Sequence, residues 1–158
     1  MSFAMQPAQN VSGFPWGSDR ASGSDQTYPR GTPVTWDAAS QELDEHAGTT
    51  TVTDILGVSL EGTTAGVEAN PSGTVNFAYA GRENIFQAKL ISSAGAVVTA
   101  DTANINVEYG ILKVGSGATA WWGVDEDDTT NVTVEVIDID TERNVVFFKF
   151  IESAIQNP

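Results

Sequence analysis

Hydrophobic and polar residues alternate most regularly near the end of the chain. Residues 132–136 alternate three valines with a threonine and a glutamate, which is the two-residue period of a strand with one buried face. After the polar residues 141–144, a second run rich in β-branched and aromatic side chains covers 145–151. Two such runs joined by a short polar turn predict an antiparallel hairpin over 131–151. Asp138 shares the face of the valines, so the strand is predicted to leave the core or to bulge there.

Shorter runs of the same kind precede the hairpin. Strands are predicted at 31–36, 55–60, 66–69, 74–79, 85–91, 105–114 and 120–124. The alternation changes phase after Gly110, which predicts a bulge at that residue. Residues 37–47 fit either one helical turn or a polar strand pair. Short strands separated by turn residues are typical of an all-β fold, either an antiparallel β-sandwich or a small β-barrel.

The first thirty residues have no such periodicity. They hold three prolines, and their two aspartates balance their two arginines, so the formal net charge of −14 lies wholly in residues 31–158. Large apolar or rigid side chains are spaced along this neutral segment: Phe3, Phe14, Pro15, Trp16 and Tyr28. Because such side chains are costly to leave in water, we predict an extended N-terminal arm, 1–30, that docks on a neighbouring subunit or partner. The alternatives are an arm folded back over its own domain, 31–158, and plain disorder.

The net charge excludes several kinds of partner. With 21 acidic and 7 basic residues, the chain has no basic cluster to neutralise phosphates, so no nucleic acid and no anionic membrane surface is expected as a partner. It contains no cysteine, which rules out disulfides and cysteine-based zinc sites. The first residues lack the basic and apolar regions of a secretory signal, so the chain is expected to be cytoplasmic when made.

Candidate catalytic chemistry is sparse. His46 is the sole histidine and stands among acidic residues in a stretch that suggests a solvated surface. No Gly-x-Ser-x-Gly motif accompanies it. Paired carboxylates of the glycosidase type specify nothing in so acidic a chain. We therefore predict a protein that is not an enzyme, and keep a hydrolase using acidic residues only as a remote alternative.

Residues 125–128 form the densest charge cluster. Read as an EF-hand loop from Asp125, the chain has Thr130 where glycine is required and Val136 where the bidentate glutamate is required. That motif fails, and neither a metal nor another cofactor is predicted. A looser calcium site stays as an alternative to a solvated loop that discourages association of a sheet edge.

Trp121 and Trp122 are adjacent in a predicted strand. Neighbouring strand residues face opposite sides, so one ring is expected in the core and the other outward. An outward indole is suited to a protein interface or to stacking on a sugar. Both residues are therefore candidates for partner binding.

Several short segments, taken in order, resemble one family. They are Arg82-Glu-Asn-Ile-Phe-Gln-Ala88, Thr99-Ala-Asp-Thr102, Asn104-Ile-Asn-Val-Glu-Tyr109, Asp127-Asp-Thr-Thr130, Val132-Thr-Val-Glu-Val-Ile-Asp138 and Phe148-Lys-Phe-Ile-Glu152. Together with short strand-like segments upstream, they resemble the capsid decoration (cement) proteins of tailed bacteriophages, especially marine and cyanobacterial phages. The resemblance covers roughly residues 31–152. The chain departs from that pattern at 140–144, where the family often carries a Pro-Asp-Asn-like turn.

The resemblance implies a viral structural protein that binds the outer surface of the assembled phage head and bridges neighbouring major capsid protein subunits. It would be made in the host cytoplasm and reside on the virion. It also implies a homo-oligomer, with a trimer favoured over a dimer. A carbohydrate-binding or adhesion module using Trp121 and Trp122, with or without calcium, is the alternative function.

Overall fold

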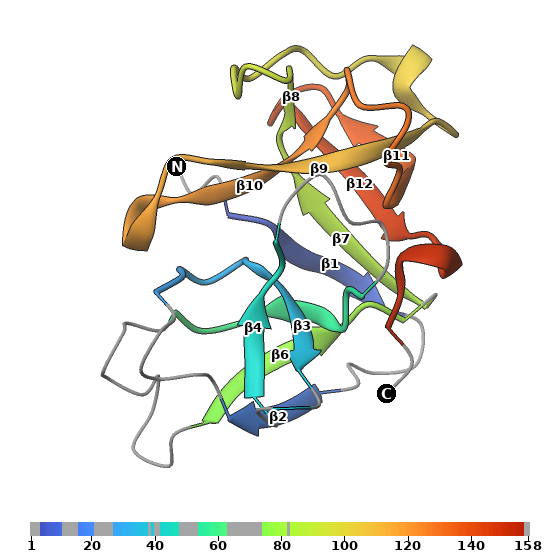
Figure 1. Ribbon diagram of the computed structural model, residues 1–158. Coiled ribbons are helices and arrows are strands. Elements are labelled where there is room, and N and C mark those ends of the chain that lie inside the picture. The colour runs from blue at the N-terminus through green and yellow to red at the C-terminus, as the bar shows by residue number, and fades with distance from the viewer. Residues whose placement is uncertain are drawn as a thin grey trace.

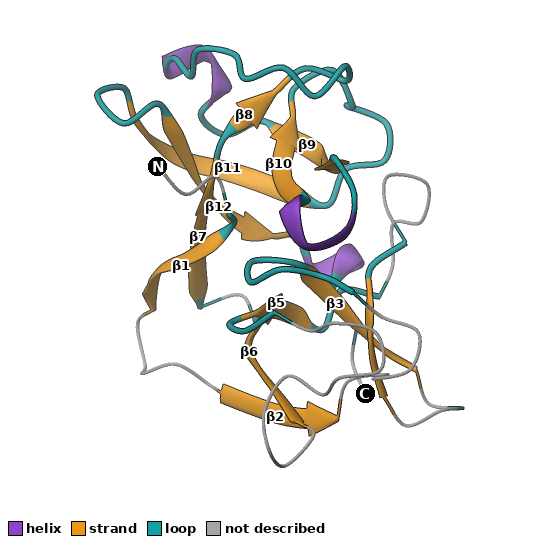
Figure 2. Cartoon of the chain, turned by 90° about the vertical axis from the view of Figure 1, so that its left-hand side faces the viewer, coloured by secondary structure: helices purple, strands orange, loops and turns teal. Residues whose placement is uncertain are grey.

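The structure, a computed structural model, describes residues 4–10, 16–20, 27–37, 39, 42–47, 54–62, 74–81 and 83–156. Its strands form two sheets, which Figures 1 and 2 show one above the other. The first sheet has the order β1 (Gln6–Asn10), β7 (Asn84–Ala88), β12 (Val145–Phe150), β11 (Val134–Asp140), β9 (Glu108–Val114), β10 (Trp121–Asp125) and β8 (Leu90–Ile91). The second has the order β2 (Trp16–Arg20), β6 (Thr74–Tyr79), β5 (Gly57–Ser59), β3 (Pro33–Asp37) and β4 (Glu42–Glu45). The prediction of an all-β fold is confirmed.

The first sheet curls back on itself. β7 and β8 are separated only by Lys89, yet β7 pairs with β12 while β8 pairs with β10. The strands β7, β12, β11, β9, β10 and β8 therefore form a closed ring, and β1 is added outside it on β7. The buried ammonium group of Lys89 donates hydrogen bonds to the carbonyl oxygens of Arg143 and Asn144, 2.9 Å away for Asn144. Lys89 thus ties the point where the ring closes to the turn between β11 and β12.

The predicted hairpin is confirmed as β11 and β12. Val146, Phe148 and Phe150 are buried, whereas the residues between them are half-buried. The register of β11 against β12 shifts between Val136 and Asp138, so the bulge predicted near Asp138 is present. The bulge turns the carboxylate of Asp138 out of the core. A charge buried there without a partner would destabilise the fold.

The prediction of a bulge at Gly110 is wrong. The pairing of β9 with β10 runs without a shift from Val114 to Gly110. What changes at Gly110 is the partner strand, because Glu108 and Tyr109 pair with β11 instead. The strand also begins later than predicted, at Glu108, after a 3₁₀ turn at Thr102–Asn104 and a left-handed residue, Asn106 (φ 62°).

Two apolar clusters stabilise the sheets. The larger cluster lies between them and joins Val58 and Ala78 of the second sheet to Phe86 and Trp122 of the first. The smaller cluster lies on the other face of the second sheet, around Phe77. Neighbouring residues of β6 therefore face different clusters, and both faces of that strand are buried. Such a strand tolerates little change in register, because a slip by one residue would exchange its two faces.

In the described part of the polar stretch 37–47, Asp37 ends β3 and residues 42–45 form β4, in agreement with the second predicted alternative, a polar strand pair. β3 and β4 pair from Val34 with Glu45 to Asp37 with Glu42. The C-terminal segment fastens this pair to the ring, since Gln156 accepts a hydrogen bond from the backbone N–H of Trp36 (2.7 Å) and donates one to its carbonyl (2.9 Å). The strand predicted at 66–69 lies outside the described residues.

Two parts of the predicted arm pair with the protein's own sheets. β1 lies antiparallel on β7, and β2 lies antiparallel on β6. Met5, just before β1, is buried in the larger cluster. The described parts of residues 1–30 therefore follow the alternative in which the arm folds back over its own domain, and docking on a neighbour stays a prediction.

Candidate functional site

The two adjacent tryptophans face opposite sides of β10, as predicted. Trp122 is 0% exposed and Trp121 is half-buried. The Trp122 ring meets His46 edge to face, with centroids 6.0 Å apart. Trp122 is thus a core residue, and its assignment to partner binding is corrected: the second sheet covers it. Trp121 keeps the outward role.

His46 is not the surface residue that its acidic neighbours suggested. His46 is only 4% exposed. Its backbone N–H donates a hydrogen bond to the carbonyl of Pro33 (2.9 Å), which holds the end of β4 against β3. That position brings its ring against Trp122 of the first sheet. Beside it, Glu45 and Lys113 form an ion pair of 2.7 Å between β4 and β9. These contacts join the two sheets, which is a structural role.

Tyr28 is also a core residue rather than a docking residue. Its side chain is 1% exposed and belongs to the smaller cluster with Val34 and Phe77. Burial raises the pKa of the Tyr28 hydroxyl well above its usual range, and the negative charges of Asp44 and Glu45 raise it further. Sequence reasoning placed Tyr28 in the arm because it precedes the periodic region, and no local pattern marks its burial.

Most of the other predicted anchors of the arm lie outside the residues that the structure describes. Phe3, Phe14 and Pro15 lie outside the described residues. Trp16 is the first residue of β2 and pairs with Ala78 through the backbone, while its side chain lies outside what is described. Among the predicted partner-binding residues whose side chains the structure describes, Tyr28 and Trp122 are buried and only Trp121 reaches the surface.

The acidic loop after β10 is held by its own carboxylates. Asp125 accepts a hydrogen bond from the N–H of Asp127 (3.1 Å), and Asp127 accepts one from Ser93 (2.8 Å). Asp128 accepts from the N–H groups of Thr130 (3.1 Å) and Asn131 (2.9 Å). Each carboxylate thus satisfies backbone donors of a turn. Within the described residues, no group of three or more His, Asp or Glu side chains could hold a metal ion.

Asp125 makes stability depend on pH. It is only 3% exposed, and burial, together with the charges of Asp127 and Asp128, raises the pKa of its carboxyl group despite the N–H of Asp127, which lowers it. The folded protein therefore holds a proton in a pH interval where the unfolded chain has released it. Across that interval, the free energy of unfolding falls as pH rises.

We therefore expect Asp125→Asn to be more stable than the wild type at neutral pH, because an amide oxygen still accepts the Asp127 N–H without bearing a charge. The two proteins should converge at acidic pH, where Asp125 is protonated. Urea unfolding followed by circular dichroism from pH 3 to pH 8 measures both effects. A wild-type advantage at neutral pH would mean that the charge stabilises the loop.

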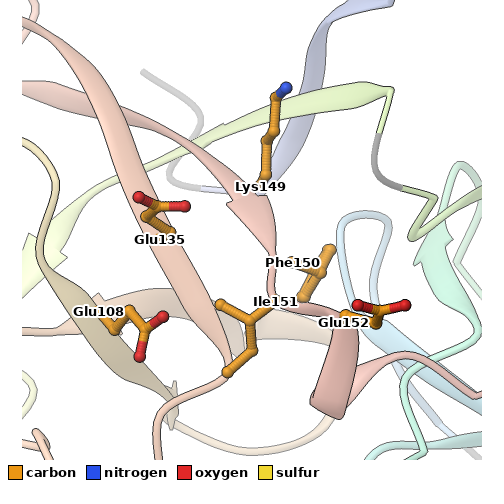
Figure 3. A pocket seen from close by; sticks show the side chains of 6 residues that line it. All are labelled: Glu108, Glu135, Lys149, Phe150, Ile151 and Glu152. Atoms are coloured by element: carbon orange, nitrogen blue, oxygen red, sulfur yellow. The ribbon is translucent and has the colours of Figure 1, made fainter.

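An open groove lies on the outer side of the ring, where β9, β11 and β12 meet (Figure 3). It measures about 350 Å³, and six residues line it: Glu108, Glu135, Lys149, Phe150, Ile151 and Glu152. Ile151 lies between the glutamates of β9 and β11 on one side and Glu152 on the other (Figure 3). The groove therefore combines an apolar centre with a rim of three glutamates and one lysine.

The rim follows from strand register. Glu135 stands directly opposite Glu108 on one neighbouring strand and opposite Lys149 on the other. Like charges at directly opposite positions destabilise a sheet, and opposite charges stabilise it, so Lys149 offsets part of the repulsion between Glu108 and Glu135, and a basic side chain of a partner would offset more. Sequence reasoning missed these residues, because only the pairing of three strands makes them neighbours.

Comparisons with known proteins identify no relative: no protein-family model matches, and neither the curated proteins nor the solved structures contain a match. In the part of the chain that the structure describes, no helix has the length and apolar character needed to cross a membrane.

Proposed function

We propose that this protein is a capsid decoration protein of a tailed phage, which binds the outside of the assembled head and bridges neighbouring coat subunits. The observation that carries the proposal is the place of the resembling segments in the fold. Residues 82–88, 104–109, 132–138 and 148–152 supply parts of β7, β9, β11 and β12, which are four strands of one closed ring. Most of the segments that carry the resemblance therefore lie in one structural unit, the ring, and the upstream segments that the structure describes lie in the second sheet.

One surface feature is suited to binding a partner. The groove between β9, β11 and β12 offers carboxylates around Ile151, and this chemistry suits a lysine or arginine side chain of a coat protein. Among the described residues, Val97 is the only large hydrophobic side chain that is exposed, at 42%. A protein that binds only the assembled shell, in many copies, raises the cost of disassembly by mass action.

Co-sedimentation tests the proposal. The purified protein should pellet with heads of the phage that encodes it, and should stay in solution with unassembled coat protein. Glu135→Lys should weaken the pelleting, because it reverses the charge at the centre of the groove's rim. The matched control is Glu142→Lys, which makes the same change at an exposed position of the β11–β12 turn. Failure of the wild-type protein to pellet with heads would refute the proposal.

The arm needs its own variants. Phe14→Ala and Trp16→Ala should reduce binding to heads if these side chains dock on a neighbouring subunit. Deleting residues 1–30 would be a less specific test, because it would also remove β1, β2 and the buried side chains of Met5 and Tyr28. Binding that is indifferent to both point variants would contradict docking by the arm.

The carbohydrate-binding alternative now depends on Trp121 alone, since Trp122 is buried. A glycan array with and without calcium, repeated with Trp121→Ala, distinguishes it from the capsid proposal. Sugar binding that this substitution abolishes would favour the alternative.

A further inference from the structure

The two N-terminal strands share an unusual position. β1 is the outermost strand of the first sheet, and β2 is the outermost strand of the second. In the described part of the chain, each therefore pairs along one edge only. The pairings are regular: β2 matches β6 from Trp16 with Ala78 to Arg20 with Thr74, and β1 matches β7 from Gln6 to Asn10 with one irregularity.

The strands that receive them are held independently. β7 pairs with β12 on its other edge, and its continuation β8 pairs with β10, so the ring closes without β1. β6 likewise pairs with β5 on the edge away from β2. If β1 and β2 left, two ordered strand edges would remain: the edge of β7 fits residues 6–10 of this same chain, and the edge of β6 fits residues 16–20. An uncovered edge of this kind recruits another strand.

Charge restricts which part of one copy can approach another. The two arginines and two aspartates of residues 1–30 cancel, whereas residues 31–158 carry the whole net charge of −14. The bodies of two copies repel each other, but the neutral segment meets no such penalty at the edge of a second body. Seven residues separate Arg20 from Tyr28, and a chain of that length reaches about 25 Å when extended. The segment can therefore cross to a neighbour while Tyr28 stays in its own core.

We propose that the N-terminal strands exchange between copies of this chain, so that β1 and β2 of one copy pair with β7 and β6 of a second copy. Such an exchange reproduces contacts that the single chain already makes, which is why it is a low-cost route to an oligomer. Reciprocal exchange gives a dimer, whereas head-to-tail exchange gives a ring where the rotation between copies closes and an open filament where it does not. Pairing within one chain benefits from an effective concentration in the millimolar range, so exchange occurs where copies are crowded or refold together.

Cysteine crosslinking tests the exchange, because the chain has no cysteine of its own. Gln6 and Gln87 are directly paired and both half-buried, and opposite positions of two antiparallel strands come close enough for a disulfide. One chain carries Gln6→Cys and a second, with a larger tag, carries Gln87→Cys. The two are mixed, unfolded, refolded together at high concentration and oxidised. The expected result on a non-reducing gel is a band at the combined mass of the two unequal chains.

Two controls make the result decisive. Pairing Gln6→Cys with Ala94→Cys, an exposed position on a loop of the ring, reports random collision and should give no such band. Both substitutions on one chain, Gln6→Cys with Gln87→Cys, should form the bond within that chain at high dilution. If this double variant oxidises while the complementary mixture stays unlinked, exchange is overturned. If neither forms a bond, the β1–β7 pairing on which the proposal depends is itself wrong. The experiment uses the isolated protein, so its outcome is independent of binding to heads.

Discussion

Replacing Trp122 with alanine is expected to lower the free energy of unfolding by about 3–5 kcal/mol, the usual cost of removing a large buried aromatic side chain. The indole is fully buried between the two sheets and contacts His46 of the second sheet. Its loss would leave a cavity where the sheets meet, and the closed ring on one side limits how far the structure can collapse into it. Domains of this size are stable by about 5–15 kcal/mol, so the variant should lose a large share of its stability and unfold at a much lower urea concentration. Urea denaturation followed by far-ultraviolet circular dichroism measures the difference.

Trp121→Ala is the matched control for this experiment. The two residues are neighbours on β10 and lose the same atoms, but Trp121 is half-buried on the opposite face. Its replacement should cost much less stability, because less apolar area returns to water and no enclosed cavity forms. Equal losses for the two variants would contradict the assignment of Trp122 to the core and Trp121 to the surface.

The strands could be predicted because their signals are local. The hairpin of β11 and β12 alternates with a clear period of two, and the charge at Asp138 on an apolar face indicated the bulge that the register shows. At Gly110 the same reasoning failed. There the pattern changes because β9 passes from β11 to β10 as its partner, and a single strand carries no record of which strand lies beside it.

The closure of the first sheet could not be predicted for a related reason. Lys89 stands inside one apolar run, 85–91, which predicts one strand. The structure divides the run at Lys89 and gives its two parts to different neighbours. A lysine in such a run usually extends its charged group to solvent. Here the ammonium group is buried and bonded to two carbonyl oxygens of a turn more than fifty residues away.

The candidate site was predicted only in part, and the reason is again long-range. Sequence reasoning selects aromatic residues, but burial separates them: Tyr28 and Trp122 lie in the core, and Trp121 keeps a surface. Conversely, nothing in the local sequence marks Glu108 and Glu135 as site residues. Only the register of β9 and β11 places them opposite each other. The polar strands β1 and β2 have no apolar periodicity, so only their backbone pairing reveals their position.

Gly57→Ala is the second substitution for which we expect a large effect, a loss of about 3 kcal/mol in the free energy of unfolding, at the upper end of the usual cost of overpacking. β5 is the middle strand of the second sheet, and Gly57 pairs with Val34 on one side and Tyr79 on the other. A methyl group at this position would overlap the carbonyl oxygen of Ala78 and approach the Phe77 ring to 2.7 Å. The carbonyl belongs to a paired strand and the ring is fully buried, so neither can move aside cheaply.

Gly81→Ala is the control, since a methyl group there would meet no atom within 4 Å. It should leave stability unchanged or raise it slightly, because alanine restricts the unfolded chain more than glycine does. Thermal unfolding of the two variants beside the wild type is sufficient to compare them. The same comparison also probes the N-terminal strands: β6 pairs with β5 on one edge and with β2 on the other, so a shift of β6 away from Gly57 should loosen β2. In the crosslinking experiment, a Ser18→Cys/Asn76→Cys pair should then oxidise more slowly in the Gly57→Ala background than in the Gly81→Ala background. Equal stability of the two glycine variants would show that β5 and β6 are spaced more widely at Gly57 than the described backbone places them.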